Sequence, residues 1–251
     1  MSARGTFVSI LAWPLKGLVR TILSPSLYQQ VRVTFLGEQS GLGLDWRWAN
    51  SLRRPHPIRR DFGWQAGQPI DRYYTEQHFL PACRADIRGR VLEFGAEKVT
   101  VSEVLHLHPD TPGATICADL TQADHIPSDS FDCIILTFTL QFIFDVRAAI
   151  RTVARILKPG GVALLVFPGI TQISRYDMDN WGEFWRFTSL SARRLFEEVF
   201  RPDDVTVTTY GNVLAATASL QGLISSELRR EELDHWDRDY ELVIGLRAVK
   251  R

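Results

Sequence analysis

The chain lacks both a long apolar run and an excess of charge of one sign. It has 251 residues, 29 of them basic and 29 acidic, and 45% are apolar. No apolar run reaches the roughly 18 residues of a membrane span, and a bulk nucleic-acid binder would normally carry a basic excess. Both classes are therefore disfavoured, and we expect a globular protein of one or two domains.

Cysteine is scarce as well. Cys83, Cys117 and Cys133 are widely spaced and form no CxxC motif. This pattern predicts neither a disulfide framework nor a zinc site, and it is typical of reduced thiols in a cytoplasmic protein. No cluster of Asp, Glu and His has ligand spacing, so we expect no metal site.

The balanced charge hides an asymmetry along the chain. Residues 1–60 contain nine basic and two acidic side chains, a net charge of +7. The remaining 191 residues therefore carry 20 basic and 27 acidic side chains, a net charge of −7. A split of this kind often marks a segment that contacts an anionic surface or partner.

Residues 7–23 form an amphipathic pattern within this basic arm, interrupted by Pro14, Lys16 and Arg20. One interpretation is a helix packed on the rest of the chain or on a second copy, which would make a homo-oligomer. The other is a helix lying in an anionic membrane surface, such as the bacterial inner membrane, with Trp13 as interfacial anchor. The sequence leaves both open.

Apolar runs and helical periodicity alternate in the remainder of the chain. The predicted strands are 90–95, 99–104, 131–139, 161–167, 204–210 and 240–249, and the predicted helices are 145–157, 189–200 and 212–228. The alternation predicts an open, doubly wound α/β domain over 85–251, with a mostly parallel sheet covered by helices on both faces. A lid or helix segment, 61–84, would link it to the arm, 1–60. Ligands of such sheets bind beyond the carboxyl ends of the strands.

Four motifs carry a family resemblance. They are VLEFG at 91–95, ADL at 118–120, IPSDSFDCIIL at 126–136 and ILKPGGVALLVFPG at 156–169. Their order and spacing resemble those of class I S-adenosylmethionine-dependent methyltransferases, which have a Rossmann-like seven-stranded sheet. The flanking segments 61–74 and 181–196 are similar to a bacterial subgroup often encoded with, or fused to, glycosyltransferases of polysaccharide biosynthesis.

The resemblance implies a site for S-adenosyl-L-methionine as cofactor. The residues that match are Glu93, Gly95, Glu103, Asp119, Leu120 and Thr137. Gly95 lets the backbone approach the methionyl part, and Glu103, taken as the end of the second strand, would accept the ribose hydroxyls. Asp119 resembles the carboxylate that binds the adenine amino group. Asp132 is expected to tie the start of its own strand.

The first motif departs from the family pattern. It has one glycine, and Glu103 follows Gly95 by only eight positions, which is too short for a helical crossover. Arg72 and Tyr73 are then candidates to replace the lost donors, with Arg72 pairing with the methionyl carboxylate. Two functions stay open: an active methyltransferase, and an inactive relative that serves as a scaffold in glycan or cell-envelope assembly.

The acceptor would be a small molecule or glycan, methylated on oxygen by in-line transfer. The candidate substrate residues are Trp181, Trp185, Arg186 and Phe187. Such aromatic rings stack on sugars, although a satellite hydrophobic cluster would give the same pattern. The candidate bases are His125, Asp145 and His78, each also explained by a surface or capping role. Gln141 is an amide that cannot take up a proton.

Overall fold

The structure is a computed structural model that describes residues 55–94, 103–107 and 113–251. The chain divides into two compact units, Met1–His56 and Pro57–Arg251, and the second contains the α/β domain. The expectations for residues 7–23 and for Gly95 lie outside the described residues. In the part of the chain that is described, no helix is long and apolar enough to cross a membrane.

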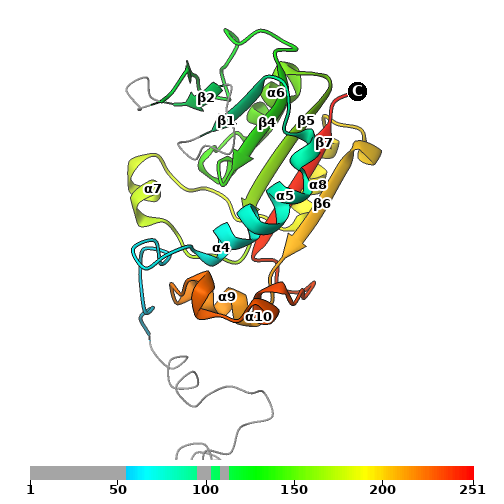
Figure 1. The fold of residues 1–251 in the computed structure, drawn as a ribbon. Coiled ribbons are helices and arrows are strands. Elements are labelled where there is room, and N and C mark those ends of the chain that lie inside the picture. The colour runs from blue at the N-terminus through cyan, green and yellow to red at the C-terminus, as the bar shows by residue number, and fades with distance from the viewer. Residues whose placement is uncertain (1–54, 95–102, 108–112) are drawn as a thin grey trace, which may run out of the picture. The chain divides into compact units, whose positions relative to one another are not determined.

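A single seven-stranded sheet forms the centre of the domain (Figure 1). Its strands are β1 (Val91–Phe94), β2 (Glu103–His106), β3 (Ile116–Cys117), β4 (Phe131–Thr137), β5 (Leu157–Pro168), β6 (Val205–Tyr210) and β7 (Val243–Val249). Their order is β3-β2-β1-β4-β5-β7-β6. Strands β1 to β5 pair in parallel, whereas β7 is antiparallel to β5 and β6. The predicted doubly wound, mostly parallel sheet is confirmed.

Helices cover both faces of this sheet. They are α4 (Ile70–Tyr73), the π-helix η1 (Tyr74–Phe79), α5 (Leu80–Ala82), α6 (Val146–Ile156), α7 (Arg175–Asn180), α8 (Ser189–Glu197), α9 (Val213–Leu220) and α10 (Arg230–Asp234). Short 3₁₀ turns are η2 (Arg84–Asp86), η3 (Leu140–Phe142), η4 (Pro202–Asp204) and η5 (Ser225–Glu227). The stretch from α4 to α5 crosses one face, and α6 and α8 lie behind the other (Figure 1).

Strand β4 and helix α6 form where the sequence predicts them. The apolar run of β4 is almost entirely buried, as suits a central strand covered on both faces. Helix α6 buries the stripe that contains Ile150 and Val153, and Asp145 caps it by accepting from the Ala148 amide at 2.9 Å. Asp132 ties the start of β4, since its Oδ2 accepts from Lys158 Nζ at 2.8 Å.

The second strand differs from its prediction. The described strand β2 covers Glu103–His106 and so continues past Val104, where the predicted strand ended. Residues 99–102 lie outside the described part of the chain. Glu103 therefore sits at the amino end of β2, away from the carboxyl edge, and its Oε1 accepts from Arg90 Nη2 at 2.7 Å. The connection 95–102 is short, yet β1 and β2 are parallel neighbours.

Two helices are shorter than predicted. Helix α9 ends at Leu220 rather than at Leu228, because Gly222, with φ +72°, turns the chain and brings Leu223 N back to the Ala218 carbonyl. Helix α8 ends at Glu197 rather than at Phe200, and Leu190 in its first turn is 62% exposed.

A glycine of β7 lets the helical stretch approach the sheet. A Cβ atom on Gly245 would lie 2.3 Å from Cδ2 of Phe79 in η1, well inside van der Waals contact. Gly245→Ala should therefore lower the free energy of unfolding by about 1–3 kcal/mol, as overpacking typically does. Urea unfolding followed by tryptophan fluorescence measures this. In a Phe79→Leu background the same substitution should cost less, and an equal cost in both backgrounds would contradict the assigned clash.

An ion pair fastens η2 to β7. Arg247 donates from Nε and Nη2 to the two carboxylate oxygens of Asp86, each at 2.8 Å, and these bonds hold the pKa of Asp86 below its ordinary value of 3.8. A depressed pKa stabilises the folded state above the unfolded pKa, and that stabilisation is lost as the pH falls through the folded pKa.

Asp86→Asn should thus lower the free energy of unfolding by about 1–2 kcal/mol at pH 7, since the pair is only partly screened by solvent. The difference from the parent should shrink as the pH falls below 3.8, the ordinary pKa at which the unfolded chain takes up the proton, and it should disappear as the pH falls through the lower pKa of the folded state. Denaturant titrations at pH 7, 5, 4 and 3 measure this, and a difference that is constant across the series would refute it.

Candidate functional site

Two cavities lie at the carboxyl edge of the parallel strands. The first has a volume of 670 Å³ and is lined by Arg72, Phe94, His106, Leu107, Ala118, Asp119, Leu120, Thr121, Thr137, Phe138, Thr139, Phe142, Ile143, Phe144, Asp145, Asp177 and Trp181. The second has a volume of 530 Å³ and is lined by Arg60, Asp61, Phe62, Trp64, Asp71, Arg72, Phe138, Gln141, Phe142, Pro168, Thr171, Gln172, Ser174, Arg175, Tyr176, Asp177, Glu183 and Leu242. Both volumes are in the range of small-molecule sites.

Four residues line both cavities. They are Arg72, Phe138, Phe142 and Asp177. The two cavities therefore adjoin, and a ligand in one would lie next to a ligand in the other. A reaction between two bound molecules needs such a junction.

Phe138 shapes the junction through its backbone. It follows β4 with φ +49°, a left-handed conformation that is uncommon for a bulky residue. Its amide donates to the Val166 carbonyl at 2.9 Å, and its own carbonyl accepts from Nε2 of Gln141 at 2.8 Å. These two bonds hold the turn and place the Phe138 ring between the cavities.

Arg72 provides the positive charge at the junction. Its Cζ atom lies 5.1 Å from the centre of the Phe138 ring and 5.3 Å from that of Trp64. Cation–π contacts of this kind fix the orientation of a guanidinium. Arg72, a predicted candidate for the cofactor's carboxylate, thus lines both cavities.

The first cavity combines a flat aromatic wall with an acidic loop. Phe94 and His106, at the ends of β1 and β2, stack with ring centres 5.9 Å apart and planes at 10°. Asp119, after β3, is exposed, and its Oδ1 accepts from the Thr121 amide at 2.8 Å. Leu120 is 2% exposed and lines the same cavity. The cavity can thus hold a planar ring between apolar contacts and a carboxylate.

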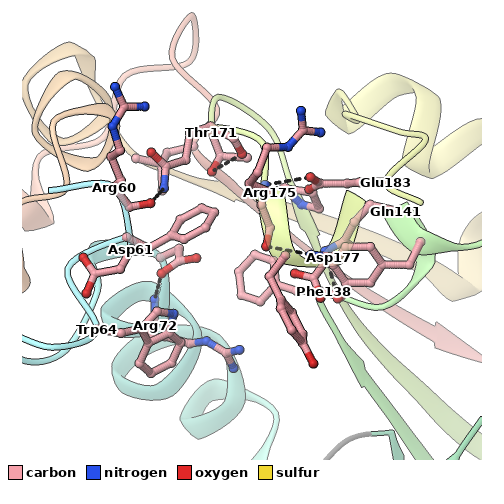
Figure 2. A pocket seen from close by; sticks show the side chains of 18 residues that line it. Arg60, Asp61, Trp64, Arg72, Phe138, Gln141, Thr171, Arg175, Asp177 and Glu183 are labelled. Atoms are coloured by element: carbon pink, nitrogen blue, oxygen red, sulfur yellow. Dashed lines mark hydrogen bonds between the residues drawn. The ribbon is translucent and has the colours of Figure 1, made fainter. Parts of the chain in front are cut away.

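The second cavity is rich in hydrogen-bond acceptors (Figure 2). Asp71 lies in the first turn of α4, where its Oδ1 accepts from the Arg72 amide at 2.8 Å, and burial among protein atoms raises the pKa of its carboxyl group. Gln141 is 3% exposed. Asp177 belongs to the short helix α7.

Some predicted cofactor residues line the first cavity and some do not. Asp119, Leu120, Thr137 and Arg72 line it. Glu93 is buried within β1 and does not line either cavity, since alternate side chains of a strand point to opposite faces. Glu103, predicted to bind the ribose, pairs with Leu92 away from the carboxyl edge and lines neither cavity. The described strand β2 ends in His106.

Tyr73 and His78 lie at a different place from the two cavities. The Tyr73 hydroxyl donates to Asp234 at 2.7 Å, and Nε2 of His78 is 3.2 Å from the same carboxylate. Asp71 and Arg72 point to the cavities, whereas the next residues of the helix have rotated to its other side, because each residue turns about 100°. Tyr73, a predicted cofactor ligand, and His78, a candidate base, therefore line neither of the two cavities.

The predicted substrate residues after α7 also lie partly at a cavity and partly away from both cavities. Trp181 lines the first cavity. Trp185 donates to the Ile143 carbonyl at 3.0 Å and lines neither cavity. Arg186 is bound to Glu183 at 2.8 Å, and Phe187, 5% exposed, packs on Phe167 in the core. Of the four predicted substrate residues, only Trp181 faces a cavity, because the other three fasten the segment to the domain.

Of the other two candidate bases, Asp145 lines a cavity and His125 does not. His125 is exposed, and its Nε2 contacts the Cys117 carbonyl at 3.1 Å, outside both cavities. Asp145 lines the first cavity while it caps α6.

Three cavity residues were not predicted from the sequence. Phe94 and His106 lie at strand ends, so the rule that ligands bind beyond the carboxyl ends of strands could have indicated them. Asp177 has no signal in the sequence. Within the described ranges, no group of three metal-ligating side chains could hold an ion.

Comparisons with known proteins fit this geometry. A family model described as a methyltransferase domain matches residues 61–165. A ubiquinone/menaquinone biosynthesis C-methyltransferase of Pectobacterium carotovorum is 32% identical over 82 residues, which is 33% of this chain and 30% of that protein. The chain thus spans about a third of the length of this curated relative.

Two solved structures are also similar. One is an S-adenosylmethionine-dependent methyltransferase from Thermotoga maritima, with a TM-score of 0.47 and 15% identity over 72% of this chain and 94% of that one. The other, from Mesorhizobium loti, has a TM-score of 0.43 and 22% identity over 68% of this chain and 96% of that one. The methyltransferase domain match thus covers residues 61–165 of the chain, and the described residues form a seven-stranded sheet in which β7 alone is antiparallel.

Proposed function

We propose that the chain is an S-adenosylmethionine-dependent methyltransferase that binds its cofactor in the 670 Å³ cavity. The observation that carries this proposal is the position of that cavity beyond the carboxyl ends of β1 to β4, next to a second cavity that can hold the acceptor. The cofactor supplies a methyl group activated by a positively charged sulfur, so the protein's task is to bind and align.

The residues present fit the adenosine half of the cofactor. Asp119 offers a carboxylate oxygen for an exocyclic amino group, and Leu120 offers an apolar surface for the adenine ring. The Phe94–His106 stack adds a flat aromatic surface.

The methionine half needs a partner for its carboxylate. Arg72 lines the same cavity, and its orientation is fixed by Trp64 and Phe138. A guanidinium held in this way can bind a carboxylate through two parallel hydrogen bonds. We therefore assign Arg72 to the methionyl carboxylate of the cofactor.

Two variants should separate the two halves of the ligand. Arg72→Met should weaken binding of S-adenosylhomocysteine about tenfold to a hundredfold, the loss of one or two charge-assisted hydrogen bonds, while binding of adenosine, which has no methionyl carboxylate, stays unchanged. Asp119→Ala should weaken both ligands. Isothermal titration calorimetry measures all four affinities.

The control variant is Arg147→Ala, which removes an exposed ion pair with Glu198 that lies outside both cavities. It should leave both affinities unchanged. If the parent chain binds no S-adenosylhomocysteine at millimolar concentration, the methyltransferase proposal fails and the scaffold function in glycan or cell-envelope assembly is favoured. Equal losses for adenosine and S-adenosylhomocysteine in Arg72→Met would contradict the assignment of Arg72.

For the acceptor of this reaction, we propose a small molecule or glycan that is methylated on oxygen. Two rings support this proposal: Tyr176 in the second cavity and Trp181 in the first, whose ring centres are 5.3 Å apart with planes at 87°. Both are substantially exposed, and exposed aromatic rings beside polar side chains suit stacking on a sugar ring.

We also propose that residues 7–23 hold the protein at an anionic membrane surface. The support is the net charge of +7 in residues 1–60 and the amphipathic pattern around Lys16 and Arg20. Lys16→Glu with Arg20→Glu in the full chain should lower co-sedimentation with phosphatidylglycerol vesicles at least fivefold, since each basic residue contributes about 1 kcal/mol. Unchanged sedimentation would reject this role and favour packing on the domain or on a second copy, which sedimentation velocity detects.

A further inference from the structure

One buried polar atom of the second cavity has no partner. Gln141 is 97% buried, as its exposure of 3% shows, and its Oε1 accepts no hydrogen bond from any residue that the structure describes. The residue lines the 530 Å³ cavity, and Figure 2 shows its side chain among those that face the cavity. A buried acceptor without a donor is costly, about 1–3 kcal/mol, so a ligand that donates there would be favoured.

The orientation of this amide is set by the turn beside it. Nε2 of Gln141 donates to the Phe138 carbonyl at 2.8 Å. The reversed amide would bring two oxygen atoms together, because a carbonyl oxygen cannot donate. Oε1 is therefore the atom that remains for a ligand, and a group that binds there must carry an N–H or O–H bond.

Asp177 stands at the junction of the two cavities. It lines both, and no side chain or amide among the described residues donates a hydrogen bond to its carboxylate, whereas its own amide donates to Ser174 Oγ at 3.4 Å. A carboxylate at this place can take a proton from a nucleophile that lies between the acceptor cavity and the cofactor cavity.

The three other acidic groups of this cavity each accept hydrogen bonds from the protein. Glu183 accepts from the Ser174 amide and from Arg186, each at 2.8 Å. Asp61 accepts from the amides of Gly63 and Gln65 at 3.1 and 3.0 Å, and Asp71 accepts from the Arg72 amide at 2.8 Å. Gln141 Oε1 and the Asp177 carboxylate have no such donor among the described residues, so they are the better candidates to bind a ligand.

We propose that the 530 Å³ cavity takes an alcohol or amine, with Gln141 Oε1 holding the O–H or N–H group and Asp177 accepting its proton. This inference rests on the proposed function and deepens it, since it names the residues that hold the acceptor's donor group and take its proton. It favours a heteroatom acceptor over a carbon acceptor, and Gln141 is its positioning residue.

Methyl transfer to such an acceptor makes one bond and breaks one. A lone pair of the acceptor oxygen or nitrogen forms a bond to the methyl carbon, and the bond from that carbon to sulfur breaks with its electron pair remaining on sulfur. The products are the O-methyl or N-methyl acceptor and S-adenosylhomocysteine. The proton released by the acceptor passes to the Asp177 carboxylate and then to solvent, so no oxidant or metal is required.

Binding of matched probes tests the role of Gln141 without any turnover. The probes are benzyl alcohol, benzylamine and ethylbenzene, which share a ring and differ in the donor group. In Gln141→Met, the affinity for each donor probe should fall about fivefold to tenfold relative to the affinity for ethylbenzene, the value of one lost hydrogen bond. A purely structural role of Gln141 would weaken all three probes equally, and that result, or no binding of either donor probe to the parent chain, overturns the proposal.

The same titrations with S-adenosylhomocysteine present keep the two proposals distinguishable. If that ligand does not bind, the proposed function fails, while the probe ratios still report on Gln141. Arg147→Ala serves as the control that should leave the probe ratios unchanged.

Turnover then tests Asp177. With S-adenosylmethionine and each donor probe, Asp177→Asn should lower the rate of methyl transfer about 10²- to 10⁴-fold, the usual contribution of a general base. The affinity for the uncharged benzyl alcohol should change less than twofold, since an amide oxygen still accepts a hydrogen bond from it. Mass spectrometry and NMR of the product identify the methylated atom, with benzyl alcohol and benzylamine distinguishing oxygen from nitrogen. An unchanged rate, or methylation on carbon, contradicts the proposal.

Discussion

The left-handed turn at Phe138 is the constraint on which the site depends. A bulky residue with φ +49° costs about 1–3 kcal/mol, and the buried strand β4 before it offsets that cost by fixing where the chain must turn. The turn places the Phe138 ring under Arg72 and directs the Phe138 carbonyl to Gln141. One strained residue thereby positions a cation for the first cavity and an acceptor for the second.

The secondary-structure elements that could be predicted from the sequence are those whose apolar pattern is compatible with only one type of element. The apolar run of β4 and the stripe of α6 specify buried elements, and the parallel strands then bring Asp119 and Thr137 to one edge. Strand β2 was misplaced because four residues are too few for a periodic signal. The error moved Glu103 from the amino end of the strand to the edge where ligands bind.

The remaining errors come from segments whose neighbouring residues face different ways. In the stretch from α4 to η1, Arg72 and Tyr73 are adjacent, yet one lines the cavities and the other binds Asp234. Between Trp181 and Phe187 the chain passes from a cavity to the core. Without regular periodicity, the sequence cannot tell which aromatic ring touches a ligand and which one packs inside.

The shared position of Arg72 also bears on what the second cavity can hold. If the guanidinium binds the cofactor's carboxylate, its charge is neutralised from the side of the first cavity. An anionic acceptor would then compete for the same guanidinium, and it would also face the carboxylates of Asp71 and Asp177. An alcohol or a neutral amine meets neither difficulty and supplies the donor that Gln141 Oε1 lacks. In the proposed site, the layout of charge around the junction thus favours an acceptor without negative charge.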